Sequence, residues 1–147
     1  MENVSLKIKS VDPDELVKKI NIILSEYLPQ IYSYNNLIRD KKYYLKPVHI
    51  VTKKKPDGNY IKYYYYGRYW YRIERRRDKP SRIKWIYLGK DKPEPDLPEP
   101  PENPLEGLVV KISKEGVEII TSKKETYRLI YEALASSQYR GEEAQAL

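Results

Sequence analysis

Apolar residues recur with a helical period in the first third of the chain. Asp12 and Pro13 suit the N-cap and the first helical position, and Glu15 completes the spacing of a capping box. Pro29 is expected to end or kink this helix, and residues 30–38 to add one or two more helical turns. The apolar positions that share one predicted helical face are Leu16, Ile20, Ile23, Leu24 and Tyr27.

From Tyr43 onward the pattern becomes that of β-strands rich in Tyr, Ile, Val and Trp. Turn-forming residues at 55–59, 67–68 and 78–81 divide this region. Gly67 leaves two interpretations open: a two-residue hairpin turn, or a bulge that merges the two middle strands into one long bent strand. The strands predicted with the hairpin turn run over residues 47–54, 60–66, 69–76 and 82–88.

The rest of the chain combines a proline-rich stretch with a second set of short elements. Residues 93–104 hold six prolines, which predicts an extended, semi-rigid connector. Strands are expected over 108–112 and 117–121, followed by a helix that begins after a capping box at Ser122. Residues 4–9 alternate and suggest one further strand.

These elements predict an α+β fold, in which a twisted antiparallel sheet, built as a meander, is backed by an N-terminal and a C-terminal helix. We divide the chain into residues 1–92, which hold a helix and the tyrosine-rich sheet, an acidic connector at 93–106, and a hairpin with a helix at 107–147. The last part is expected to pack on the same domain.

Charge is concentrated in one segment. The net charge is +7, but residues 39–92 carry 18 Lys and Arg against 5 Asp and Glu, a net of +13. Residues 93–106 carry no Lys or Arg and 5 Asp and Glu, a net of −5. A segment this basic favours polyanionic partners. For the acidic connector we consider two roles: a solvated spacer whose charge aids solubility, or a segment that lies near the basic sheet and competes weakly with phosphate.

Composition narrows the class of protein further. The chain has 16 Tyr, 2 Trp and no Phe, a choice of aromatic residues that suits half-exposed surfaces where rings stack and hydrogen-bond. Without cysteine it can form neither a disulfide scaffold nor a thiolate metal site, and His49 as the single histidine argues against zinc. No cofactor is expected, and no stretch has the length of a membrane span. We expect a cytoplasmic protein whose composition fits a thermophile or an AT-rich genome.

The most informative stretch is residues 60–90, where aromatic and basic residues alternate. In a strand from Tyr69, we expect Tyr69, Tyr71 and Ile73 to pack against the helices, and Trp70 and Arg72 to face outward with Glu74 and Arg76. Arginine grips phosphates and aromatic rings stack on bases. The predicted nucleic-acid-binding residues are Lys53, Lys54, Lys55, Lys62, Arg68, Trp70, Arg72, Arg75, Arg76, Arg77, Arg82 and Lys84.

The blocks GRYWYR at 67–72 and KWIYLG at 84–89 resemble the three-stranded sheet of integrase arm-type DNA-binding domains. In those domains a short sheet enters the major groove, so the resemblance implies DNA binding. The whole chain, being small, basic and free of cysteine, is similar to DNA-binding accessory proteins of crenarchaeal viruses and plasmids. A viral origin would place it in the host cytoplasm.

The sequence therefore predicts a non-enzymatic nucleic-acid-binding protein that contacts the phosphate backbone of DNA, in preference to RNA, through a basic aromatic sheet face. One alternative is a protein-binding module, such as a viral or plasmid inhibitor of a host protein. A second is a metal-dependent nuclease that would use acidic residues such as Glu106, Glu115 and Glu118. A homodimer also stays open.

Overall fold

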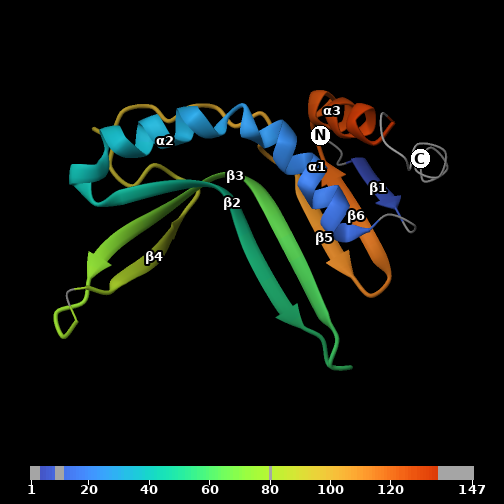
Figure 1. Cartoon of the computed structure of the whole chain (residues 1–147), viewed down its shortest axis with the longest axis horizontal. Helices are drawn as coiled ribbons and strands as arrows, with labels where there is room; N and C mark the ends of the chain where they lie inside the picture. The colour runs from blue at the N-terminus through green and yellow to red at the C-terminus, as the bar shows by residue number, and fades with distance from the viewer. Residues whose placement is uncertain (1–3, 9–11, 80, 136–147) are drawn as a thin grey trace.

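The computed structural model describes residues 4–8, 12–79 and 81–135, and it has the predicted α+β architecture (Figure 1). An antiparallel sheet carries its helices on one face. In chain order the elements are β1 (Val4–Ile8), α1 (Pro13–Ser25), α2 (Leu28–Leu37), the 3-10 helix η1 (Arg39–Lys41), β2 (Tyr43–Lys54), β3 (Tyr60–Arg75), β4 (Ile83–Gly89), β5 (Val109–Ser113), β6 (Gly116–Thr121) and α3 (Lys124–Ala135).

Helix α1 begins where the sequence predicts. The Asp12 side chain accepts a hydrogen bond of 3.0 Å from the Asp14 backbone N–H, and Pro13 follows as the first helical residue. A turn at Glu26 and Tyr27 then separates α1 from α2, and Pro29 lies in the first turn of α2, where its missing N–H costs no helical hydrogen bond. Proline here therefore starts the second helix.

The sheet is organised around the long strand β3. Its neighbours follow the order β1-β6-β5-β3-β2, and β4 also pairs with β3. Along one edge β3 pairs with β2 over nearly its whole length. Along the other edge it pairs with β5 at Lys62–Tyr65 and with β4 at Trp70–Arg75. The middle strands predicted from the sequence are thus a single strand, and Gly67 lies at a bend within it.

This bend depends on a bulge. The β2–β3 register shifts between Lys46 and Val48, so that Pro47 lies opposite both Gly67 and Arg68. Proline donates no ladder hydrogen bond, and a Cβ at Gly67 would lie in van der Waals contact with the Tyr69 ring, at 3.4 Å. The buried Asn103 amide nitrogen donates to the carbonyl oxygens of Gly67, at 2.8 Å, and Pro47, at 3.2 Å. Asn103 thereby satisfies carbonyl groups that the disrupted ladder leaves unpaired.

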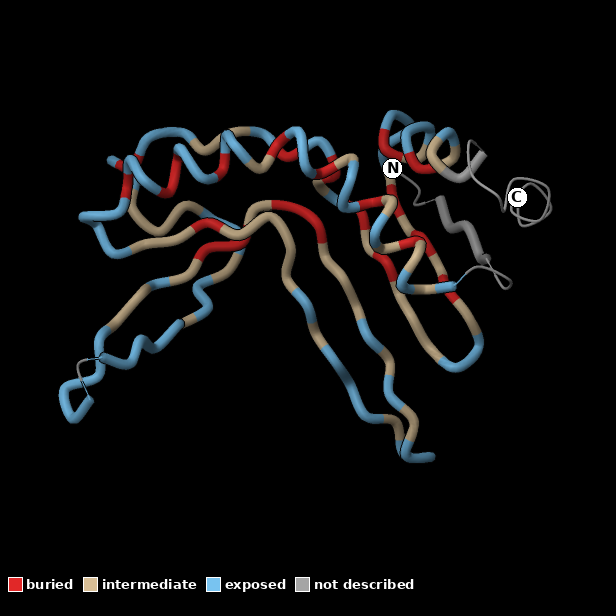
Figure 2. The backbone as a smooth tube through the Cα atoms, viewed as in Figure 1, coloured by how far each residue is buried: buried red, intermediate tan, exposed pale blue. Residues whose placement is uncertain are grey.

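Two hairpins diverge from the bend on the side away from the helices (Figure 1). The β3–β5 pairing ends at Lys62, and β2 and β3 continue past it as the first ribbon, residues 53–62. The β2–β3 pairing ends at Arg72, and β3 and β4 continue as the second ribbon, residues 72–84. Figure 2 shows that the buried part of β3 is at the bend and that the hairpin tips are exposed.

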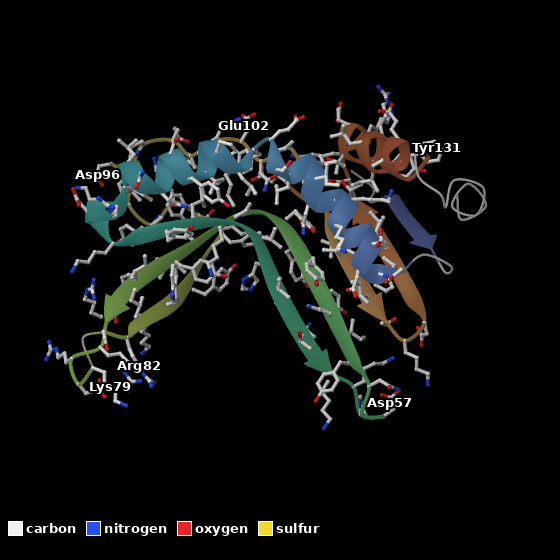
Figure 3. The ribbon with its side chains drawn as sticks, viewed as in Figure 1. Asp57, Lys79, Arg82, Asp96, Glu102 and Tyr131 are labelled. Carbon is white, nitrogen blue, oxygen red and sulfur yellow. The ribbon has the colours of Figure 1, made fainter. Side chains whose placement is uncertain are left out.

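The proline-rich connector packs on the helix side of the sheet. Its Leu97 is buried, and the Tyr27 and Tyr34 hydroxyls donate hydrogen bonds to the carbonyl oxygens of Pro101 and Pro98. Figure 3 shows the acidic side chain of Glu102 near the helices, far from the hairpin tips. The hypothesis that this segment lies along the basic sheet face is therefore not supported, since the segment completes the core under α1 and α2 instead.

Candidate nucleic-acid interface

The sheet face opposite the helices lies inside the bend, and we call it the inner face. Cross-strand partners share a face, and the partners Lys46 with Tyr69, Tyr71 with Tyr87, and Ile73 with Trp85 define it. Toward the first ribbon, the inner face continues through four more residues, His49, Tyr63, Tyr65 and Lys53.

His49 joins the aromatic rings at the centre of the inner face. Its ring stacks on Tyr87 with centroids 4.3 Å apart and planes 14° apart, and on Tyr69 at 5.4 Å. Its Nδ1 lies 2.8 Å from the Tyr71 hydroxyl, within hydrogen-bonding distance. Burial and the nearby Lys46 ammonium lower the pKa of His49, so this ring is neutral at pH 7. Burial also raises the pKa of Tyr69 to about 12.

Lysine ammonium groups lie over these rings. Lys46 Nζ is 4.6 Å from the Tyr71 ring centroid and 4.7 Å from that of Trp85. Lys53 Nζ is 5.3 Å from the ring of Tyr63 on the first ribbon. Such cation–π contacts hold the positive charges close to aromatic surface. The inner face thus combines flat rings with cations, the two chemical groups that bases and phosphates bind.

The two ribbons carry most of the exposed cations predicted from the sequence. The first ribbon holds four lysines and one aspartate, a net of +3, and the second holds seven Lys and Arg and two acidic residues, a net of +5. In Figure 3, Asp57 marks the tip of the first ribbon, and Lys79 and Arg82 mark the tip of the second. The predicted residues that are exposed on the ribbons are Lys53, Lys54, Lys62, Arg72, Arg75, Arg76, Arg77, Arg82 and Lys84. They form two groups at the ends of two hairpins, where we had expected one continuous face.

Some of these cations are already paired. Arg72 Nε lies 3.0 Å from Glu74, and an Arg76 guanidinium nitrogen lies 3.1 Å from Asp78. Both pairs are exposed to solvent, and pairs of this kind contribute only ~0–1 kcal/mol to stability. A phosphate could therefore displace the carboxylates at little cost. Lys55, in contrast, is half-buried in the turn of the first ribbon, where its backbone N–H donates to the Asn59 carbonyl at 2.7 Å.

The prediction that Trp70 lies on the binding face is wrong. Its side chain is only 1% exposed and packs edge-on against Tyr34 of α2, with ring centroids 6.0 Å apart. The two faces of this part of β3 are consequently the reverse of what we expected: Trp70 faces the helices, while Tyr69 and Tyr71 face away. Both faces carry aromatic residues, so alternation alone could not decide which one the helices cover.

Arg68 is also separated from the other predicted residues. Its Nε donates to Glu106 Oε1 at 2.9 Å, and the other Glu106 oxygen lies 4.0 Å from Lys123 Nζ. The Arg68 side chain is about one-third exposed and belongs to the bend, where it links β3 to the end of the connector. We therefore assign it to the framework that holds the bend.

Sequence reasoning missed Lys46, His49, Trp85 and Tyr87 as members of the site. From the sequence, we considered His49 only as a possible zinc ligand, and the pattern around β4 did not indicate which face Trp85 and Tyr87 occupy. The bulge at Pro47 brings these residues together. Residues three apart in a regular strand point to opposite faces, but the bulge places Lys46 and His49 on the same face.

No protein family model, curated protein or solved structure matches this chain. Within the described part of the chain, no three His, Cys, Asp or Glu side chains gather as a metal site would require. Of the helices among residues 12–79 and 81–135, none is long and apolar enough to cross a bilayer.

Proposed function

We propose that this protein binds DNA without an enzymatic step, using the two basic ribbons to grip the phosphate backbone on either side of the inner face. The observation that carries the proposal is the common direction of the ribbons: both leave the sheet on its inner side, and both end in clusters of exposed Lys and Arg (Figure 3).

The shape of the ribbons favours duplex DNA. The major groove of B-DNA, about 12 Å wide and about 8.5 Å deep, admits a two-stranded β-ribbon. At ~3.3 Å per residue, the strand from Val48 to Lys54 spans about 20 Å, enough to carry its tip past the groove floor. The major groove of A-form RNA is too narrow for side chains to enter, so DNA is the better fit for a protein that uses ribbons.

The charge on the ribbons favours the phosphate backbone over base recognition. Lysines dominate the first ribbon, and Lys contacts phosphate as a point charge without a preferred base geometry. Phosphate contacts position a protein on DNA but carry little sequence information. Weak sequence preference with strong salt dependence is therefore expected.

A protein-binding module is the second candidate, and one observation favours it. Strand β4 exposes four large apolar side chains, a pattern that is typical of protein interfaces. These are Ile83, Trp85, Tyr87 and Leu88. Aromatic and basic groups would serve such an interface as anchors, and an acidic partner surface would match the ribbons.

A fluorescence anisotropy titration with a labelled random-sequence duplex tests the proposal. With about six to ten phosphate contacts, affinity should fall by roughly 10³–10⁵ between 50 and 200 mM salt. Binding that ignores salt, or no binding at low salt, would contradict DNA binding and leave the protein-binding candidate. RNA duplex of the same sequence should bind more weakly than DNA, since the ribbons could not enter its major groove.

A further inference from the structure

A pocket of about 370 Å³ lies beside the inner face, between the helical layer and the strands. Helix α2 and η1 contribute Tyr32, Asn36 and Arg39, while Tyr44, Ile73 and Trp85 come from β2, β3 and β4. Pockets that bind small organic groups begin at ~300 Å³. This one therefore has room for one planar ring system.

The walls of the pocket are aromatic and open to solvent. The Trp85 ring meets Tyr44 edge to face, with centroids 5.2 Å apart and planes at 90°, so the two rings form a right-angled corner. Trp85 is 43% exposed and Tyr32 is 58% exposed, and their apolar faces are thus available to a flat group. A nucleobase is such a group, and every base can stack because every base has a π-face.

The polar groups of the pocket match a nucleotide. Arg39 is the one charged residue of the pocket lining, and its guanidinium can hold a phosphate in a bidentate fork. The exposed Asn36 amide offers a donor and an acceptor to a base edge. Asn35 is already committed, because its amide bonds both the N–H and the carbonyl of Leu45, at 2.8 and 2.9 Å.

Trp85 connects the pocket to the inner face. The same ring that lines the pocket lies under Lys46 Nζ and meets Tyr71 edge-on at 6.3 Å. A nucleic acid held by the ribbons over the inner face therefore passes next to the mouth of the pocket. We propose that the pocket takes one unstacked nucleobase from a single-stranded segment of that nucleic acid, with the neighbouring phosphate on Arg39. This inference rests on the proposed DNA binding.

Tryptophan emission and a pair of matched variants test the pocket. Titration with an eight-nucleotide oligo(dT) at low salt should quench the protein's emission, and Trp85→Phe should abolish the quench because the remaining Trp70 is buried. Arg39→Ala should weaken oligo(dT) binding about tenfold, because it removes one phosphate contact and leaves the stacked base less well positioned. Lys41→Ala is the control: it removes the same charge from η1 at a residue outside the pocket lining.

An abasic oligonucleotide of equal length separates base binding from charge. Tyr32→Ala should weaken binding of oligo(dT) and leave abasic binding unchanged, whereas Leu37→Ala, at an exposed position of the same helix outside this pocket, should affect neither. Duplex binding should survive the substitutions at Tyr32, Leu37, Arg39 and Lys41, because these residues lie in α2 and η1 and not on the ribbons or the inner face. Equal effects of Arg39→Ala and Lys41→Ala, or a quench that persists in Trp85→Phe, would overturn the pocket while leaving duplex binding intact. Failure to bind any nucleic acid at low salt would overturn the proposed function itself.

Discussion

Asn103 donates a 2.8 Å hydrogen bond to the carbonyl of Gly67, a residue 36 positions earlier in the chain. The contact joins the end of the proline-rich connector to the bend of β3, from which both ribbons leave the sheet. The oxygen of the same Asn103 amide accepts a hydrogen bond from the Leu105 N–H at 2.9 Å, so one buried side chain fixes two segments. The direction of the ribbons therefore depends on a residue outside the basic segment.

Asn103→Ala should strongly destabilise the protein. The substitution leaves the Gly67 and Pro47 carbonyls and the Leu105 N–H without their partner in a buried region, at a cost of about 2–4 kcal/mol. Urea denaturation measures the change in the free energy of unfolding. Asn21→Ala, at an exposed position of α1, should cost less than ~0.5 kcal/mol. A loss no larger than that of this control would show that the amide does not hold the bend.

Tyr66→Phe should stabilise the protein. Tyr66 is only 1% exposed, and within the described structure its buried hydroxyl has no hydrogen-bond partner. Removal of an unsatisfied hydroxyl should raise the free energy of unfolding by about 1–2 kcal/mol, with a higher Tm. Tyr27→Phe is the matched control, because the Tyr27 hydroxyl donates to the Pro101 carbonyl at 2.8 Å. The control should lose about 1 kcal/mol of unfolding free energy. A loss of stability in both variants would show that the Tyr66 hydroxyl does have a hydrogen-bond partner.

Stability should fall at mildly acid pH through His49. The folded-state pKa of His49 lies below its unfolded value of about 6.5, so the unfolded chain binds the proton more readily. The contribution of His49 is therefore complete above about pH 6.5 and is lost as pH falls toward the folded value. Urea denaturation at pH 7.5, 6.5 and 5.5 measures this loss. In His49→Gln the decline over this range should be shallower, and an identical decline in both proteins would exclude His49 as its source.

The acidic connector should influence DNA binding through net charge alone. Asp96 and Glu102 lie on the helix side of the sheet, away from the ribbon tips (Figure 3), and Glu99 pairs with Lys92 at 3.0 Å. Changing all three to the corresponding amides should tighten duplex binding no more than the same change at Glu26, Glu115 and Glu132, which are also exposed. A distinctly larger gain from the connector variant, measured at low salt, would indicate that the connector competes with phosphate after all.

Local signals in the sequence predicted where helices and strands lie, but neither that the two middle strands are one nor how the elements face one another. The Asp12–Pro13 start of α1 was predicted correctly because capping involves residues that are adjacent in sequence. The sequence left two alternatives for the middle of the sheet, a hairpin or one long bent strand. The long strand forms because of the β2–β3 register at Pro47 and the Asn103 hydrogen bonds, and no local sequence pattern reveals either of these. Trp70 was assigned to the wrong face for the same reason: the face that becomes buried is decided by distant partners such as Tyr34.

The salt dependence of duplex binding by a first-ribbon variant tests the central claim most directly. Lys53→Gln, Lys54→Gln and Lys55→Gln combined remove three of the four lysines on that ribbon, and each lost phosphate contact should reduce the slope of log K against log salt by about 0.9. A control with Lys18, Lys114 and Lys124 changed to Gln loses the same charge from exposed positions outside the ribbons. We predict a slope smaller by about 2–3 for the ribbon variant and nearly unchanged for the control. Equal slopes for the two variants would contradict the binding of DNA by the ribbons.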